Sequence, residues 1–292
     1  MYPIGFTLLP FTIIGAILQI AIIYVILRQK LQFTSPFLYL TLVKSYNDFV
    51  YMAAQMLYYT PMVILSTQIL VDNVHYGAFV VNLTYEIMIN SHLVLTANRF
   101  LAVFTPILYK ELFTNSKTKI YALAVFLVSA SYLSIFSFIL DCRVAYTPEN
   151  YLLISDLYRP VCQWFFDNID SWKNLTNVLL QFLANVIIVA KIQWVRKKKK
   201  PTNRSDVLRK KELNFLKQIF FQTFIYALGA MSYYLTPFLG TSDFVTFVFC
   251  FLEWAVIGML EGFFTMFFIS EIRNHVFRKI RKTQSASVET IF

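Results

Sequence analysis

The stretch NRFLAVFTPILY, residues 98–109, closes a long apolar run and places a permanent charge at its edge. Arg99 lies beside Asn98, after the apolar residues and before a proline, Pro106. Proline has no backbone N–H and its ring clashes with the preceding turn, so it does not continue a helix comfortably. We therefore expect a long helix that ends a fixed distance after Arg99, where apolar surroundings give way to polar ones.

The composition around this stretch is that of a membrane protein. The 292-residue chain is 58% hydrophobic and only 14% charged, whereas soluble domains carry roughly 25% charged residues. The net charge of +10 comes from basic residues in short stretches between apolar runs, and no nucleic-acid-binding motif is visible. We therefore predict an integral membrane protein with membrane lipids as partners and no nucleic acid partner.

Seven apolar stretches are long enough to cross a bilayer, which needs about 20 predominantly apolar residues for each helix. The predicted spans are 5–27, 36–65, 77–104, 120–140, 172–195, 213–238 and 244–269. No internal repeat is visible. We predict an all-α membrane protein: one seven-transmembrane helix bundle over residues 1–282, followed by a short cytosolic tail, 283–292.

The distribution of lysine and arginine predicts the orientation of the bundle. With the N-terminus outside and the C-terminus inside, only three of the 26 Lys and Arg residues fall in outer loops. These are Arg143, Arg159 and Lys173. Positive residues are enriched on the cytosolic side, so this orientation is the expected one. Residues 270–281 place apolar side chains on one side and basic ones elsewhere, as in a short amphipathic helix, helix eight.

Two interpretations of Arg99 are open from the residues alone. A charge costs about 2.5–3.5 kcal/mol at the centre of an inserted helix and less near its end, so Arg99 either reaches water at the interface or faces the bundle. Helical spacing places His92, Tyr85 and Val81 within about 40° of Arg99. We expect all of these side chains to face the interior of the bundle.

The residues around Arg99 resemble the end of helix three and the second inner loop of rhodopsin-like G-protein-coupled receptors. The residues that carry this resemblance are Asn98, Arg99, Phe100, Pro106 and Tyr109. Three longer runs are similar to the nematode serpentine chemoreceptors, most of all to class X. They are YYTPMVIL (58–65), SHLVLTANRFLAVFTPILYKELF (91–113) and LEGFFTMFFISEIRN (260–274).

The resemblance implies a chemosensory receptor that binds a small-molecule or peptide cue in its outer half and activates a heterotrimeric G protein. The five residues named above would then form the G-protein-coupling site. Candidate residues of the ligand pocket are Val81, Tyr85, Tyr234 and Trp254. The family also implies the plasma membrane, with a sensory-neuron cilium as the site. One departure is Asn98, which replaces the usual acid before the arginine. The alternative function is a transporter or a ligand-gated channel.

The cysteine pattern predicts one disulfide and no metal site. Cys142 and Cys162 both lie in the outer segment between the fourth and fifth spans. Because the outside of a cell is oxidising, we expect them to pair, a bond that contributes about 3 kcal/mol in the chain-entropy model. Two free buried thiols are the alternative. No Cys/His cluster and no catalytic carboxylate pair is visible, so we expect no metal, no cofactor and no enzymatic activity.

Charged residues inside the spans are the remaining candidates. Lys44 and Asp48 lie one helical turn apart in the second span and are expected to form an intramembrane polar pair that neutralises itself. Asp48 as an ion site is the alternative. Glu86 and Glu253 have no evident partner in the sequence, and we expect both to be neutral.

Overall fold

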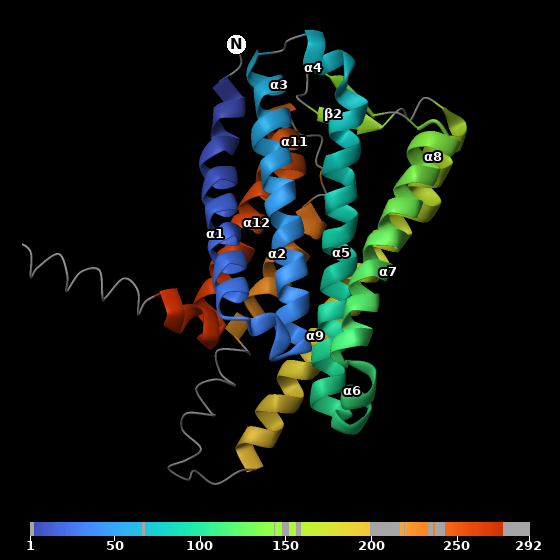
Figure 1. The fold of residues 1–292 in the computed structure, drawn as a ribbon. Helices are drawn as coiled ribbons and strands as arrows, with labels where there is room; N and C mark the ends of the chain where they lie inside the picture. Colours follow the sequence, from blue (N-terminus) through green and yellow to red (C-terminus); the bar gives the residue numbers. More distant parts are fainter. Residues whose placement is uncertain are drawn as a thin grey trace, which may run out of the picture.

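The chain folds into a bundle of long helices with one small hairpin at one end (Figure 1). This computed structural model describes residues 3–65, 68–142, 144–147, 152–155, 159–198, 217–218, 220–232, 236 and 243–276. The first half contains η1 (Pro3–Thr7), α1 (Leu8–Arg28), η2 (Leu31–Phe33), α2 (Pro36–Ala54), η3 (Gln55–Tyr59), α3 (Thr60–Leu65), α4 (Gln68–Asp72), α5 (Val74–Phe104) and α6 (Pro106–Leu112).

The second half of the chain adds the remaining helices of the bundle and the hairpin. It contains α7 (Asn115–Ser134), η4 (Ile135–Ile139), β1 (Val144–Thr147), β2 (Leu152–Ser155), α8 (Pro160–Phe165), η5 (Phe166–Asp170), α9 (Ser171–Lys198), a helix at 220–232, α11 (Asp243–Phe247), η7 (Val248–Leu252), α12 (Glu253–Phe268) and a helix at 270–276. We call the end of the bundle that carries β1 and β2 the outer end, and the end that carries α6 the inner end.

Five helices among the described residues are long and apolar enough to cross a membrane. They are Gly5–Arg28, Val74–Phe104, Asn115–Ile139, Pro160–Val195 and Phe244–Phe268. The second predicted span is also one unbroken helix, built from α2, η3 and α3, and the polar residues Lys44 and Asp48 interrupt its apolar sequence. The sixth predicted span is described only in part and is helical over 220–232.

The long helix α5 ends at the position that the sequence predicts. Its last residue is Phe104, and Thr105 leaves the helical conformation with φ −135° and ψ 68°. Pro106 then occupies the first position of α6. Proline is favoured there because the first helical residues have no intrahelical partner for their N–H groups. The chain therefore turns sharply after Arg99 and continues as a short helix beneath the bundle.

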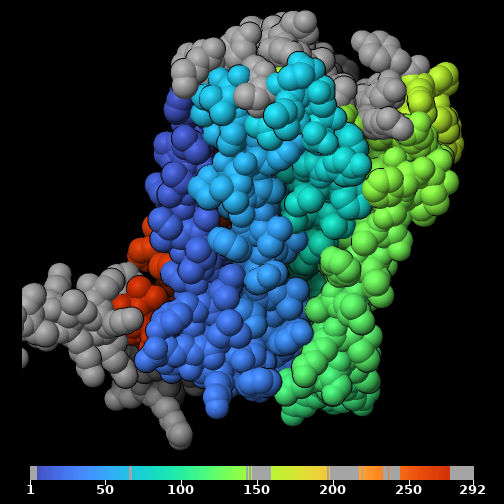
Figure 2. All heavy atoms as spheres, turned by 45° about the horizontal axis from the view of Figure 1, so that its top comes forward, coloured from blue at the N-terminus to red at the C-terminus, as the bar shows by residue number. Residues whose placement is uncertain are grey.

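The helices α1, α2 and α12 pack together on one side, and α5 runs through the middle between α2, α7 and α9. In Figure 2, α1, α2 and α5 form one continuous surface with α7 at its edge. Glycines allow the close contacts around α12: a Cβ at Gly258 would lie 1.9 Å from Met52 Cε, and one at Gly262 would lie 3.1 Å from Leu18 Cβ. Close packing at small residues is the usual basis of helix association in lipid, which offers no hydrophobic driving force between helices.

Four π-helical turns lie in the outer halves of four different spans. They are η3, η4, η5 and η7, in the second, fourth, fifth and seventh spans. A π turn inserts an extra residue into the α-helical ladder and occurs frequently at functional sites. The backbone is therefore less regular in the outer half of the bundle than in its inner half.

The outer end adds one small feature to the helical bundle that the sequence did not predict: β1 and β2 form an antiparallel two-stranded sheet in which Val144 pairs with Ser155. Tyr146 of β1 is 6% exposed and packs into a hydrophobic cluster with Leu8 and Tyr59 of the bundle. Two β-prone runs, VAYT and LLIS, are the sequence signal for this hairpin. The outer loop is also shorter than expected, since Pro160 starts α8 well before the predicted fifth span.

Candidate functional site

Arg99 faces the interior of the bundle at its inner end rather than the surrounding solvent. Arg99 is only 6% exposed. Its Nη2 donates a hydrogen bond to Gln222 Oε1 at 3.3 Å, and its guanidinium carbon lies 5.2 Å from the centre of the Phe37 ring. Arg99 therefore joins α5 to the helix at 220–232 and to α2.

The acceptor that holds Arg99 is itself fixed by a third helix. Gln222 Nε2 donates to Thr265 Oγ1 of α12 at 3.3 Å, which leaves the amide oxygen facing Arg99. This arrangement is a charge-assisted hydrogen bond to a neutral acceptor, a class of bond that contributes about 1.5–3 kcal/mol. Among the described residues, Asn98 Nδ2 has no hydrogen-bond partner although Asn98 is only 2% exposed. This hydrogen-bond partner of Arg99 thus lies on another helix.

The other three residues of the predicted coupling site lie around the turn that follows Arg99. The ring of Phe100 stacks on Phe104 with a centroid distance of 4.5 Å. Pro106 is exposed at the start of α6. Tyr109 is half-buried and stacks on Phe113 at 5.6 Å, within a hydrophobic cluster that includes Leu40 and Leu95. The short helix α6 is therefore packed against the inner ends of α2 and α5.

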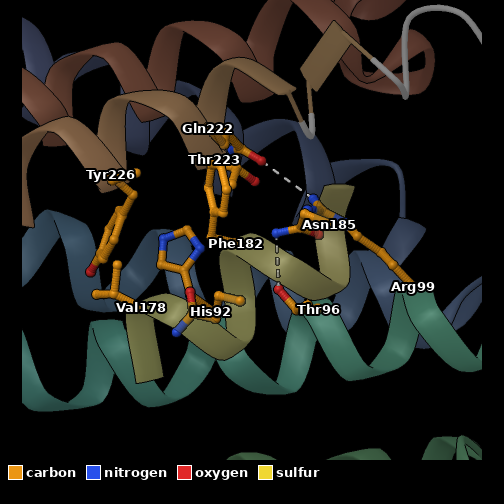
Figure 3. Close-up of a pocket in the computed structure, with 11 residues that line it drawn as sticks. His92, Thr96, Arg99, Val178, Phe182, Asn185, Gln222, Thr223 and Tyr226 are labelled. Carbon is orange, nitrogen blue, oxygen red and sulfur yellow. Dashed lines mark hydrogen bonds between the residues drawn. The ribbon is translucent and has the colours of Figure 1, made fainter. Parts of the chain in front are cut away.

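A small polar cavity lies next to Arg99, between α5, α9 and the helix at 220–232 (Figure 3). It is lined by His92, Thr96, Arg99, Val178, Gln181, Phe182, Asn185, Gln222, Thr223, Tyr226 and Ala227. Asn185 Nδ2 donates to Thr96 Oγ1 at 3.5 Å across it. The cavity leaves about 20 Å³ open to water-sized molecules, which is room for one water. Pockets for organic ligands are about 300–1,000 Å³, so the cavity in this conformation does not hold an organic cue.

Three of the four predicted pocket residues come together in the outer half. Val81 and Trp254 are each 6% exposed and belong to one hydrophobic cluster, against which Tyr85 packs. The rings of Tyr85 and Trp254 meet edge to face with centroids 5.1 Å apart. Tyr234 lies outside the described residues. The small cavity lies further toward the inner end of α5 than this aromatic cluster.

A buried ionic cluster joins four helices at the centre of the bundle. Lys44 Nζ lies 2.5 Å from Asp48 Oδ2 and also contacts Glu261 Oε2 of α12. His92 Nε2 of α5 lies 2.8 Å from Glu261 Oε1, and Gln19 Nε2 of α1 donates to Asp48 at 3.4 Å. The predicted pair of Lys44 and Asp48 is thus one part of a larger cluster. Glu261 and His92 could not be assigned to it from sequence, because no local spacing connects them with α2.

The two acids for which the sequence shows no partner both have one in the structure, and their expected neutral state stays a prediction. Glu86 Oε1 accepts from Lys173 Nζ at 2.6 Å, and Lys173 also contacts Asp170 at 3.0 Å. The same ammonium lies 3.6 Å from the centre of the Tyr132 ring. Glu253 accepts a hydrogen bond from the Ser232 hydroxyl. An outer polar cluster, distinct from the central one, therefore joins α5, α7 and α9.

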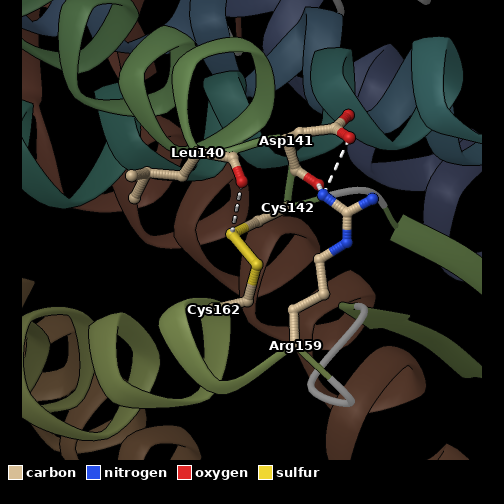
Figure 4. The surroundings of a disulfide bond; sticks show 5 residues. All are labelled: Leu140, Asp141, Cys142, Arg159 and Cys162. Carbon is tan, nitrogen blue, oxygen red and sulfur yellow. Dashed lines mark hydrogen bonds and ion pairs between the residues drawn. A yellow bond between two sulfur atoms is a disulfide. The ribbon is translucent and has the colours of Figure 1, made fainter.

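The predicted disulfide between Cys142 and Cys162 is confirmed (Figure 4). Their Cα atoms are 5.6 Å apart and both residues are fully buried. Next to the bond, Arg159 Nη1 donates to Asp141 Oδ2 at 2.8 Å. The bond fixes the start of α8 against the end of η4, so it ties the outer ends of the fourth and fifth spans together on either side of the hairpin.

The described residues contain no group of three or more His, Cys, Asp or Glu side chains arranged to hold a metal ion. In the central cluster the position between the carboxylates of Asp48 and Glu261 is taken by the Lys44 ammonium. Ammonium and carboxylates satisfy one another there by charge and by hydrogen bonds. The chain thus supplies its own cation to this site.

Comparison with known proteins relates the whole bundle to one family of membrane receptors. The family model for the serpentine type 7TM GPCR chemoreceptor Srx matches residues 9–268. Serpentine receptor class X 45 of Caenorhabditis elegans is 21% identical over 224 residues, which cover 70% of this chain and 61% of that relative. The chain therefore spans less than two thirds of the length of this curated relative.

Proposed function

The chain belongs to the serpentine type 7TM GPCR chemoreceptor Srx family, and on that premise we propose that it binds an extracellular chemical cue and activates a heterotrimeric G protein. The family is a family of seven-helix receptors in the membrane, not of enzymes. The cue, a small molecule or peptide, binds among the outer halves of the helices. The G protein binds at the inner end, around Arg99. The protein works in the plasma membrane, and we propose the cilium of a sensory neuron as its site.

The observation that carries this proposal is the burial of Arg99 and its hydrogen bond to another helix. Its guanidinium is buried at the inner end and is held by a neutral amide of a neighbouring helix, Gln222. Breaking this hydrogen bond costs about 1.5–3 kcal/mol. An outward shift of the helix at 220–232 would therefore break this hydrogen bond at a modest cost and change the position of Arg99 at the inner end.

The outer half of the bundle contains features suited to binding a cue. Its four π turns mark irregular backbone in η3, η4, η5 and η7, and the hairpin lies over it. Trp254 packs edge to face on both Tyr85 and Tyr226, with centroid distances of 5.1 and 5.7 Å. An aromatic cluster of this kind suits an apolar or aromatic cue, because ring pairs contribute about 0.5–1.5 kcal/mol beyond their buried area.

A continuous row of rings leads from this cluster toward the inner end. Tyr226 follows Trp254 in the row, and the ring of His92 lies 4.8 Å from that of Tyr226. His92 lines the same cavity as Arg99. Spatial contact alone is not coupling, but rigid packed rings can pass a displacement between the two ends. We propose that a cue which moves Trp254 changes the position of the helix at 220–232 through Tyr226.

A cell assay with Arg99→Ala tests the proposal. The wild-type chain and the variant are expressed with a broad G-protein reporter and screened with odorants and peptides. We expect a cue that activates the wild type to lose most of its response in Arg99→Ala at equal surface expression. Arg159→Ala is the matched control, because it removes an exposed arginine of the outer end. An undiminished response in Arg99→Ala sinks the role of Arg99, and a cue-gated current without a G protein indicates a channel instead.

A further inference from the structure

The outer polar cluster holds an ammonium group between two acids and an aromatic ring. Its members are Glu86 of α5, Tyr132 of α7, Asp170 of η5, and Lys173 and Asn174 of α9. Lys173 Nζ lies 2.6 Å from Glu86 Oε1 and 3.0 Å from Asp170 Oδ1. The same nitrogen lies 3.6 Å from the centre of the Tyr132 ring. Carboxylates and aromatic faces are the groups that attract an ammonium ion, so the cluster has the chemistry of an ammonium site, which Lys173 fills.

The cluster contains more hydrogen-bond acceptors than donors. The Tyr132 hydroxyl donates to Asp170 Oδ1 at 2.6 Å, and Asn174 Nδ2 donates to Asp170 Oδ2 at 3.0 Å. The other end of that amide, Asn174 Oδ1, is buried and has no hydrogen-bond partner among the described residues. Asn174 is only 7% exposed. A buried acceptor without a donor is unfavourable, so a further N–H group at this place would satisfy it.

Helical spacing places these acceptors next to the aromatic cluster of the outer half. Asn174 and Val178 are four residues apart on α9 and share one face, with a separation of about 6 Å along the helix. Val178 and Tyr85 both pack against the hydrophobic cluster that contains Trp254. Tyr85 directly precedes Glu86 on α5. An ammonium group in the outer polar cluster would therefore lie about one helical turn from the rings to which the proposed function assigns the cue.

The ammonium of Lys173 can leave the cluster toward the outer medium. Its side chain is 24% exposed and that of Asp170 is 22% exposed, so the cluster is not sealed. A lysine near the end of a span can extend its flexible stem and place its charge in water.

The acidic outer loops favour the approach of a cation. Against their three basic residues, the predicted outer loops carry seven acids: Asp72, Asp141, Glu149, Asp156, Asp167, Asp170 and Asp243. A surface with an excess of one charge raises the local concentration of ligands of the opposite charge.

We propose that the outer polar cluster binds a primary amine in its protonated form, and that this amine takes the place of the Lys173 ammonium. Exchange of one ammonium for another keeps the charge of the cluster unchanged, so the exchange does not depend on the ionisation of Glu86. A primary ammonium has three N–H donors, one each for Glu86, Asp170 and Asn174 Oδ1. An aromatic or apolar body on the amine would pack on the neighbouring rings. The inference rests on the proposed function only where it calls this amine the cue.

The test measures binding to the receptor in lipid nanodiscs. The probes are 2-phenylethylamine and 2-phenylethanol, which has the same ring but no charge, and the affinity follows from the rise of the unfolding temperature with ligand concentration. We expect the amine to stabilise the receptor and the alcohol to have little effect. Lys173→Met removes the competing ammonium, so it should bind the amine about tenfold more tightly, as expected for a site that its own lysine otherwise closes.

Variants of the acids test the location of the site. The double change Glu86→Gln/Asp170→Asn should weaken amine binding by about tenfold or more, because it removes both charged acceptors. Asp72→Asn is the matched control, since it neutralises an exposed acid of the outer end that contacts Gln68, and it should leave the affinity unchanged. If Lys173→Met or the double variant does not fold, Asp170→Asn alone is compared with Asp72→Asn.

Three results would overturn the proposal: equal binding of the amine and the alcohol, no binding of the amine to folded Lys173→Met, or the same affinity in the acid variants as in Asp72→Asn. None of these measurements involves a G protein. Amine binding without any reporter response would refute the proposed function and leave the site intact. A neutral or anionic cue that activates the reporter, with no amine binding, would refute the site alone.

Discussion

The substitution Lys44→Met measures how strongly one buried ammonium stabilises the bundle. Methionine has a similar length and no charge, so the variant leaves Asp48 and Glu261 without their shared cation. Their side chains are only 2% and 1% exposed. Removal of one partner from a buried ion pair costs about 3–5 kcal/mol. We expect the free energy of unfolding to fall by this amount.

The magnitude depends on burial and not on the mere presence of an ion pair. Arg159 and Asp141 form a pair at 2.8 Å, close to the 2.5 Å of Lys44 and Asp48, but their side chains are 48% and 40% exposed. Exposed pairs contribute about 0.2–1 kcal/mol. Arg159→Met therefore serves as the matched control and should cost several times less than Lys44→Met.

A double variant separates charge from packing. Lys44→Met/Asp48→Asn removes one acid together with the ammonium, while Glu261 keeps His92 as a partner. We expect it to recover about 2 kcal/mol or more of the loss, since residues in direct contact show coupling energies of about 0.5–3 kcal/mol. Reversible unfolding in mixed micelles of increasing denaturing-detergent content, followed by circular dichroism, gives the three free energies. If the double variant is no more stable than Lys44→Met, or if Lys44→Met costs no more than Arg159→Met, the charge argument is refuted.

Two further predictions concern the ends of the bundle. Replacing Cys142 and Cys162 together by serine should lower the free energy of unfolding by about 3 kcal/mol, whereas Cys250→Ser should change it little; equal effects of the two changes would contradict the assignment. Asn98→Asp places a carboxylate beside Arg99 and should lower basal signalling in the reporter assay, because an ionic partner holds the guanidinium more firmly than the amide of Gln222 does. A rise in basal signalling would count against this explanation.

The features that the sequence predicted well are those that local chemistry determines. Pro106 ends α5 because proline cannot continue the helix. Cys142 and Cys162 lie only 20 residues apart in one outer segment, so each has the other as a nearby partner for a disulfide. The features that it missed depend on contacts between distant segments. Glu261 is 217 residues from Lys44 and 169 from His92. The helical spacing within one span shows which of its residues share a face, but not which side chains of another span contact that face.

A large separation along the sequence also explains why the partner of Glu86 was not predicted. Glu86 is 87 residues from Lys173, and the ammonium reaches it from a span whose helix begins earlier than expected. The hairpin was missed for a different reason. Its two strands are only four residues long each and lie in the outer segment between two predicted spans, so a count of membrane spans gives them little weight.

Helix α12 reaches Arg99 through the side chain of Gln222. Thr265 of α12 accepts a hydrogen bond from Gln222 Nε2, and the amide oxygen of the same Gln222 accepts the hydrogen bond from Arg99. Trp254, in the outer aromatic cluster, lies on the same helix as Thr265. A rigid displacement of α12 would therefore disturb the amide that faces Arg99. The helix that positions this amide is thus also the helix that contacts the proposed cue site.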